Sequence, residues 1–243
     1  MRIPRFYLPQ PLTVGQSLEL PADLFRHAIQ VLRMQAGEPL ILFNGEGGEY
    51  LAQLEQVGKR AASLNVQAFD PIERESTLHL TLVQAIIKPD KMDFALQKAV
   101  ELGLSAFQPL MTQRSVVRTD KEKWEKKRQH WQAVASSACE QCGRTRLPQV
   151  LEPLTLNQYL NTPAGQATRL ILAPGAYPRL SAVQPSPPAL HVLIGPEGGF
   201  TDEEVAACLQ AGVQAISLGS RILRAETASA TVLALLQHLH GDL

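Results

Sequence analysis

The chain has 243 residues, of which 45% are hydrophobic and 19% charged, so it can bury a core large enough to fold without a metal or a disulfide. Lys and Arg total 23, and Asp and Glu total 23, which excludes binding of a polyanion through net charge alone. The first residues, MRIPRFYLPQP, lack the apolar run of a signal peptide, and no apolar run is long enough to span a membrane. Three cysteines leave one unpaired in any disulfide scheme, so we expect a cytoplasmic protein with free thiols.

The N-terminal part of the chain is rich in predicted strands. Apolar runs flank Asn44-Gly45 and Gly47-Gly48, a pattern typical of a β-hairpin. Apolar residues at helical spacing predict one short helix over residues 23–32. Residues 70–76 are polar and contain a proline, so they form the predicted linker. The predicted strands cover residues 6–8, 39–43, 50–57 and 62–69.

Beyond the linker, predicted strands alternate with predicted helices. This alternation is typical of an α/β domain in which helices cover a largely parallel sheet. Thr201, with an acidic residue three positions later, forms a capping-box pattern at the start of a helix. We therefore predict two domains, a small β-barrel over 1–72 and an α/β domain over 73–243. The predicted strands cover 78–87, 107–111, 170–173, 191–194 and 215–218, and the predicted helices begin at Asp90 or cover 121–142, 201–212 and 226–240.

A glycine-rich loop, Gly195-Pro196-Glu197-Gly198-Gly199, lies between a predicted strand and a predicted helix. Open α/β sheets bind ligands at such strand ends, and glycines let the backbone approach the ligand closely. The loop lacks the Gly-Lys-Ser/Thr of a P-loop, and Glu197 would repel a phosphate. A ligand that carries positive charge is therefore favoured, with a tight turn that binds nothing as the alternative.

A second loop, residues 219–224, follows the next predicted strand and contains Arg221 and Arg224. Two arginines beside a glycine suit an anionic or carbonyl-rich substrate. The alternative is that each arginine is solvated or pairs with a nearby acid.

Together the two loops, LIGPEGGF and LGSRILRAETA, closely resemble the C-terminal signature of the RsmE family. These are SPOUT-class 16S ribosomal RNA uridine-N3 methyltransferases that use S-adenosylmethionine. The resemblance covers nearly the whole chain in the right order, through MRIPRFYLP, HAIQVLRM, LFNGEGGEY, KMDFALQKAVELGLSAFQPLMTQRSVV and ACEQCGRTRLP.

The resemblance implies a PUA-like, RNA-binding N-terminal barrel and a SPOUT domain with a trefoil knot, in a homodimer. It implies that the methyl donor lies among three loops at strand ends. The donor-binding residues carried over are Leu172, Ala173, Ile194, Gly195, Glu197, Gly198, Gly199, Leu218, Gly219, Ile222 and Leu223.

Catalysis must remove the proton from uridine N3 or stabilise the anion that remains. Arg224 or Arg221 is expected to stabilise this anion, and Glu226 or Glu140 to accept the proton. Arg144 is a further candidate in the EQCGR segment. The predicted RNA-binding residues are Arg2, Arg5, His27, Arg33 and Arg114.

The expected partner is 16S ribosomal RNA or the assembled small subunit. The alternatives are a SPOUT methyltransferase acting on tRNA or on the ribose 2′-OH, and a non-catalytic RNA-binding ribosome factor. The chain departs from the family at three positions: Ser220 replaces a usual proline, Ala225 a common threonine, and Gln113 a common glutamate.

The segment from residue 114 to 146 holds nine Lys or Arg against four Asp or Glu, so it is either a solvated face or a phosphate-binding one. Trp124 and Trp131 are seven residues apart on one predicted helix, which favours packing against the core. Cys139 and Cys142 form a CxxC motif, but no second pair completes the four ligands of a zinc site, so no metal is predicted.

Overall fold

The computed structural model describes residues 3–115, 121–163, 165–183 and 189–243, and the chain divides into two compact units. The first unit holds Met1–Glu75 together with Cys139–Leu147, and the second holds Ser76–Ala138 together with Pro148–Leu243. The segment 139–147 thus packs with residues that precede it by more than sixty positions, a grouping that no local pattern predicts. In the described ranges, no helix is both long and apolar enough to cross a membrane.

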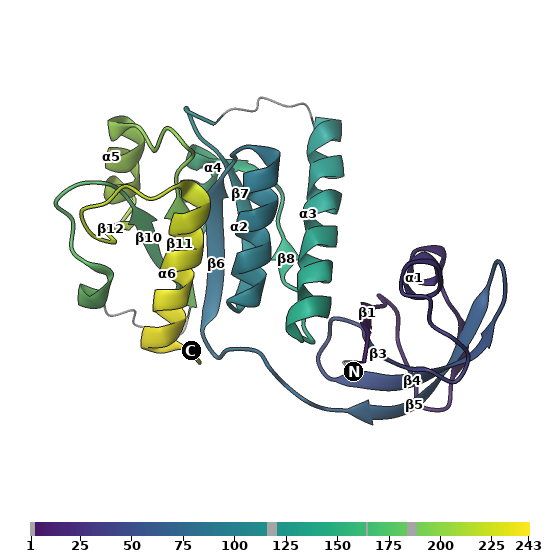
Figure 1. Ribbon diagram of the computed structural model, residues 1–243. Coiled ribbons are helices and arrows are strands. Elements are labelled where there is room, and N and C mark those ends of the chain that lie inside the picture. Colours follow the sequence, from purple (N-terminus) through teal and green to yellow (C-terminus); the bar gives the residue numbers. More distant parts are fainter. Residues whose placement is uncertain (1–2, 116–120, 164, 184–188) are drawn as a thin grey trace. The chain divides into compact units, whose positions relative to one another are not determined.

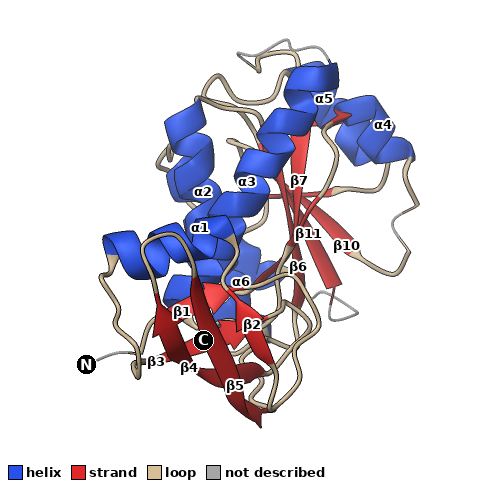
Figure 2. Cartoon of the chain, turned by 90° about the vertical axis from the view of Figure 1, so that its right-hand side faces the viewer, coloured by secondary structure: helices blue, strands red, loops and turns tan. Residues whose placement is uncertain are grey.

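The first unit is built on a five-stranded mixed sheet in the order β1-β3-β4-β5-β2 (Figure 2). Strands β1 and β3 are parallel, and the other pairs are antiparallel. Phe6 of β1 and Leu20, just after β2, share one buried cluster with Leu64 of β5. Both edges of the sheet therefore curve round a single core, as in a small barrel. The strands are β1 (Arg5–Tyr7), β2 (Ser17–Glu19), β3 (Pro39–Phe43), β4 (Glu49–Val57) and β5 (Ala62–Asp70).

The helix predicted over residues 23–32 is a short α-helix, α1 (Ala22–Phe25), that continues as a wider π-helical turn, η1 (Arg26–Val31). In η1 the Leu32 N–H donates to the carbonyl of His27, five residues earlier, at 3.0 Å. The turn ends at Arg33, whose φ of 58° places it in the left-handed region. Such a conformation cannot continue a right-handed helix.

The second unit contains a sheet in the order β12-β10-β11-β6-β7-β8, with β9 also paired to β7, and every pairing is parallel. This confirms the predicted α/β domain with a parallel sheet, whereas the knot that the resemblance implies stays a prediction. Strands β8, β9 and helix α4 were not predicted. The strands are β6 (His79–Ala85), β7 (Leu104–Met111), β8 (Gln149–Val150), β9 (Leu154–Thr155), β10 (Thr168–Leu172), β11 (Ala189–Ile194) and β12 (Gln214–Ile216).

Helices cover both faces of this sheet (Figures 1 and 2). Val83 of β6 faces a cluster that includes side chains of α4 and α5. Its neighbour Gln84 faces the other side, where Ser229 Oγ of α6 donates to Gln84 Oε1 at 2.6 Å. Trp124 and Trp131 of α3 are 9% and 4% exposed, which confirms that they pack inward. The helices are α2 (Pro89–Glu101), α3 (Lys121–Cys142), α4 (Leu156–Asn161), the 3₁₀ turn η2 (Leu180–Ala182), α5 (Asp202–Gln210) and α6 (Ala225–His240).

Local sequence signals fix several of these helix ends. Thr201 accepts from the Glu204 N–H, and the Glu204 side chain accepts from the Thr201 N–H, which confirms the predicted capping box of α5. Gly103 follows α2 with φ 80°, a conformation that favours glycine. Because all the strands are parallel, the loops after β6, β10, β11 and β12 emerge at one edge of the sheet, where a ligand site is expected.

Candidate active site

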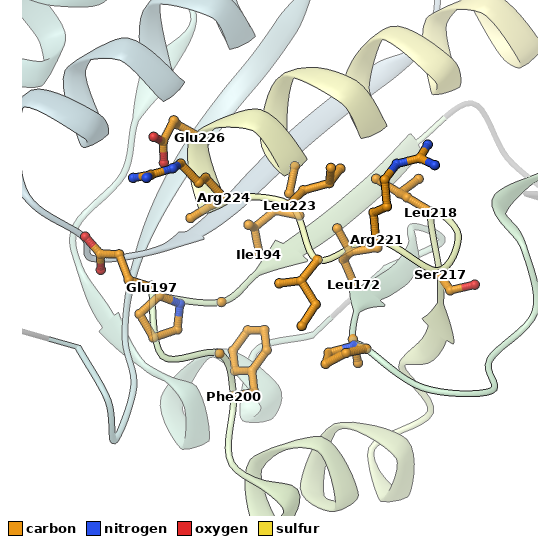
Figure 3. Close-up of a pocket in the computed structure, with 18 of the residues that line it drawn as sticks. Leu172, Ile194, Glu197, Phe200, Ser217, Leu218, Arg221, Leu223, Arg224 and Glu226 are labelled. Carbon is orange, nitrogen blue, oxygen red and sulfur yellow. The ribbon is translucent and has the colours of Figure 1, made fainter.

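A cavity of about 610 Å³ lies at the carboxyl edge of the second unit's sheet (Figure 3). It is formed by the loops after β10, β11 and β12 and by the start of α2 after β6. The structure therefore brings the three predicted loops to one cavity and adds the start of α2 to it. Ten of the predicted donor-binding residues line the cavity: Leu172, Ala173, Ile194, Gly195, Glu197, Gly199, Leu218, Gly219, Ile222 and Leu223.

The loop after β11 is tightly constrained. A Cβ on Gly195 would lie 3.1 Å from the Phe200 backbone nitrogen, closer than ordinary packing permits. Gly199 has φ 69°, a conformation that L side chains rarely adopt. The Lys88 N–H donates to Glu197 Oε1 at 3.2 Å and so joins this loop to the start of α2. The conformation of this loop therefore requires glycine at both positions.

Gly198, the remaining predicted donor contact, is not among the residues that line the cavity. Its carbonyl accepts from Arg114 Nη1 at 2.7 Å, and a Cβ on Gly198 would lie 3.3 Å from Arg114 Cδ. Arg114, predicted to bind RNA, is exposed and makes a second, longer bond to the Phe200 carbonyl at 3.4 Å. The structure therefore assigns Gly198 to the contact between two loops.

The loop between β12 and α6 brings the predicted catalytic residues Arg221, Arg224 and Glu226 to the cavity. In Figure 3 the Arg224 guanidinium lies beside Glu226, whereas the Arg221 side chain points away on the side of Leu218. The two guanidinium groups therefore lie on different sides of the cavity.

Glu226 is 9% exposed in its side chain and forms an ion pair with Lys91 of α2, with 3.0 Å between Oε1 and Nζ. Burial alone would raise the pKa of Glu226. A hydrogen bond from its own backbone N–H and the Lys91 and Arg224 cations outweigh burial, so its pKa lies below the usual range. Glu226 is therefore an ionised, weakly basic carboxylate.

Lys88 and Lys91 line the cavity, although the sequence reasoning missed both. The available signal was the Lys-Pro-Asp-Lys stretch, which starts a predicted helix at the end of a buried strand. With Arg224, Glu197 and Glu226 they make one end of the cavity charged, while Leu172, Ile194, Leu218 and Leu223 make its walls apolar. A ligand with an apolar or aromatic body and a charged end fits this arrangement.

The other two predicted catalytic residues, Glu140 and Arg144, belong to the first unit. Glu140 Oε1 accepts from the Tyr7 N–H at 2.9 Å. Burial raises the pKa of Glu140, although the Tyr7 N–H partly offsets that effect. Arg144 is 8% exposed in its side chain and pairs with Glu75. The described cavity is lined by second-unit residues, and neither Glu140 nor Arg144 is one of them.

The predicted RNA-binding residues differ in accessibility. His27 and Arg33 are exposed, and His27 packs edge-on against Phe6 at 5.4 Å between ring centroids. Arg5 is 6% exposed in its side chain and forms an ion pair with Glu49 at 3.2 Å, so its guanidinium is occupied within the unit. Arg2 lies outside the described residues.

Comparisons with known proteins identify the family of this chain. The family model of an RNA methyltransferase domain matches residues 74–237, and that of an RNA methyltransferase PUA domain matches residues 20–67. The chain is 30% identical to ribosomal RNA small subunit methyltransferase E of Buchnera aphidicola, covering 100% of this chain and 98% of the relative. It is also 30% identical to the Bacillus subtilis protein of that name, over 96% of each chain.

Two solved structures are similar over their whole length. Ribosomal RNA small subunit methyltransferase E from Neisseria gonorrhoeae, bound to S-adenosylmethionine, is 40% identical, with a TM-score of 0.93 and full coverage of both chains. A protein from Legionella pneumophila, in complex with the same cofactor, is 40% identical with a TM-score of 0.96, again over both full chains.

Proposed function

The chain belongs to the ribosomal RNA small subunit methyltransferase E family, and we propose that it transfers a methyl group from S-adenosylmethionine to N3 of a uridine in 16S ribosomal RNA. One observation carries the proposal: a glycine-lined cavity at the carboxyl edge of a parallel sheet has apolar walls and Arg224 at its charged end. The protein is a methyltransferase, and what we propose beyond that is its target, the N3 atom of a uridine.

The residues that line the cavity suit S-adenosylmethionine. A Cβ at Gly195 would crowd the loop, and Gly199 and Gly219 adopt positive φ, so backbone lines the cavity where side chains would fill it. We expect Leu172, Ile194 and Leu223 to contact the adenine ring, and Glu197 to attract the cofactor's positive charge. When bound, S-adenosylmethionine supplies a methyl group on a positively charged sulfur.

The chain must prepare uridine N3 for this transfer. N3 carries a proton, and its lone pair attacks the methyl carbon only after the N3–H bond breaks and the charge spreads to O2 and O4. A fixed Arg224 guanidinium near one of these oxygens stabilises the anion more than the neutral base. As the bond from N3 to the methyl carbon forms, the methyl–sulfur bond of the donor would break, and its electron pair would stay on sulfur and neutralise the cation there.

The proton needs an acceptor. Glu226 has a lowered pKa and a Lys91 partner, so it is a poor base. We therefore favour solvent over Glu226 as the acceptor. The first unit, with its PUA family match and the exposed His27 and Arg33, would hold RNA phosphates. We also propose that the protein is a homodimer and that it acts in the cytoplasm.

Mass spectrometry of 16S ribosomal RNA tests the proposed function. RNA from cells that lack this protein should lose one N3-methyluridine, and adding the purified protein and S-adenosylmethionine to small subunits from those cells should restore it. A missing methyl group on tRNA or on a ribose oxygen would move the activity to another substrate. Unchanged RNA would show that the protein acts without methylating RNA.

A further inference from the structure

The Lys91–Glu226 ion pair connects two helices that begin at the cavity. Lys91 lies in the first turn of α2 and Glu226 in the first turn of α6, and the helices pack side by side (Figure 1). The Lys91 Nζ lies 3.0 Å from Glu226 Oε1, with the side chains 37% and 9% exposed. A carboxylate this buried needs a partner, because an unpaired buried charge is costly.

The pair acts close to Arg224 in the chain. Arg224 is the N-cap of α6, with an extended backbone at φ −64° and ψ 152°, and Glu226 follows two residues later. An anchor on Glu226 therefore fixes the point at which the loop from β12 enters the helix. It also fixes the direction in which the Arg224 side chain leaves that loop.

The pair also decides which cation the carboxylate neutralises. Two cations act on Glu226, Lys91 from α2 and Arg224 from its own loop, while Lys88 and Glu197 line the same end of the cavity. Figure 3 shows the Arg224 guanidinium beside Glu226. Without Lys91, Arg224 would remain as the other cation that acts on the carboxylate. Arg224 would then lose much of its ability to stabilise a developing negative charge.

We propose that Lys91 is a positioning residue that acts through Glu226, holding the start of α6 and leaving the Arg224 guanidinium available to the substrate. This inference rests on the proposed function, because in that function the Arg224 guanidinium stabilises the uridine anion. It also assigns Glu226 to an electrostatic role in place of proton transfer.

Three variants test the proposal. Lys91→Met removes the charge and keeps most of the stem, Lys91→Arg keeps the charge, and Lys98→Met makes the same change on α2 at a lysine paired with Glu101 outside the cavity. At saturating RNA and donor, Lys91→Met should lower the single-turnover rate about tenfold or more, while the donor Kd changes less than about twofold. Lys91→Arg should recover most of the rate, and Lys98→Met should match wild type.

Two further measurements separate positioning from general damage. Backbone hydrogen exchange across residues 217–228, measured without cofactor or RNA, should speed up in Lys91→Met and stay unchanged in Lys98→Met. The double variant Lys91→Met/Glu226→Gln should react no more slowly than Lys91→Met alone, because both changes remove one interaction.

A wild-type rate in Lys91→Met, or additive losses in the double variant, would overturn the positioning role. Unchanged exchange over residues 217–228 would also overturn it. If the wild-type protein itself fails to methylate uridine, the proposed function fails instead, and the exchange experiment still decides whether Lys91 anchors this loop.

Discussion

The guanidinium of Arg144 and the carboxylate of Glu75 form a buried ion pair, in which Arg144 Nε donates to Glu75 Oε2 at 2.9 Å. The two side chains are 8% and 14% exposed. Arg144 was a candidate catalytic residue in the sequence, and in the folded chain its guanidinium ties the segment 139–147 to the end of the first 75 residues. Loss of this ion pair should therefore lower the stability of the fold.

Glu75→Gln should destabilise the protein by about 3 kcal/mol, because it removes the negative charge that Glu75 places against the buried Arg144 guanidinium. Glu73→Gln is the matched control, since Glu73 pairs with Arg146 and these side chains are 44% and 54% exposed. That variant should cost less than about 1 kcal/mol. Thermal unfolding of the three proteins measures the difference, and equal midpoints for both variants would contradict the structural role of the buried pair.

Gly195→Val should weaken binding of S-adenosylmethionine at least about tenfold. Its Cβ would crowd the Phe200 backbone and so displace the loop that lines the cavity. Gly198→Val is the control, because a side chain there meets Arg114 and not the cavity. Calorimetric titration of both variants, with circular dichroism as a check on folding, gives the comparison. Tight donor binding by a folded Gly195→Val protein would place the donor elsewhere.

Arg224→Ala should lower the single-turnover rate about 100-fold or more at saturating RNA and donor, because the lost cation acts mainly on the transition state. Raising the pH should partly restore the rate, since hydroxide then helps to remove the N3 proton. Arg221→Ala should have a smaller effect on this rate, because its side chain points away from Arg224 (Figure 3). The opposite ranking of the two variants would transfer the catalytic role to Arg221.

His191 should make the protein less stable in acid. The Tyr159 hydroxyl lies 2.9 Å from His191 Nδ1, and burial, with help from the Arg169 cation, lowers the pKa of His191 from 6.5 to about 4. The folded pKa is depressed, so below pH 6.5 the unfolded chain gains a proton that the folded chain does not. His191 therefore contributes stability above pH 6.5 that is lost as the pH falls toward about 4. The loss is on the order of 3 kcal/mol.

Unfolding of wild type and His191→Gln at pH 7 and pH 5 measures this contribution. The wild type should lose more stability than the variant over this interval, because glutamine keeps a hydrogen-bond partner for Tyr159 but binds no proton. His240→Gln, at an exposed histidine, should lose as much as the wild type. Parallel losses in wild type and His191→Gln would show that the histidine titrates normally.

Arg33→Ala should weaken RNA binding and reduce the slope of log K against log salt by about 1, as expected for one lost phosphate contact. Arg33 is exposed, whereas the Arg5 guanidinium is buried against Glu49. Arg5→Ala should therefore lower the unfolding midpoint, which Arg33→Ala should leave unchanged. Binding titrations at several salt concentrations decide the first point. An unchanged slope in Arg33→Ala would remove this residue from the RNA interface.

The sequence by itself determined the features that depend on neighbouring residues. The alternating strands and helices, the capping box at Thr201 and the stop at Gly103 all follow from interactions within a few positions. The helix α4 could also have been predicted, because Thr155 and Gln158 form the same capping box, but the short strands β8 and β9 offered too few residues for a period. Both glycine-containing loops were found because tight backbone geometry demands particular residues.

Only the tertiary structure decided which distant residues meet. Parallel pairing places β11 between β6 and β10, and this order brings Lys91 to Glu226 and the loop after β6 to the cavity. The tertiary structure also places Gly198 against Arg114, and it pairs Arg144 with Glu75, 69 residues earlier in the chain. No local pattern encodes these contacts, because each joins residues that are far apart in the sequence. Burial, which also depends on the whole fold, makes the Arg144–Glu75 pair costly to break and the exposed Arg146–Glu73 pair nearly neutral.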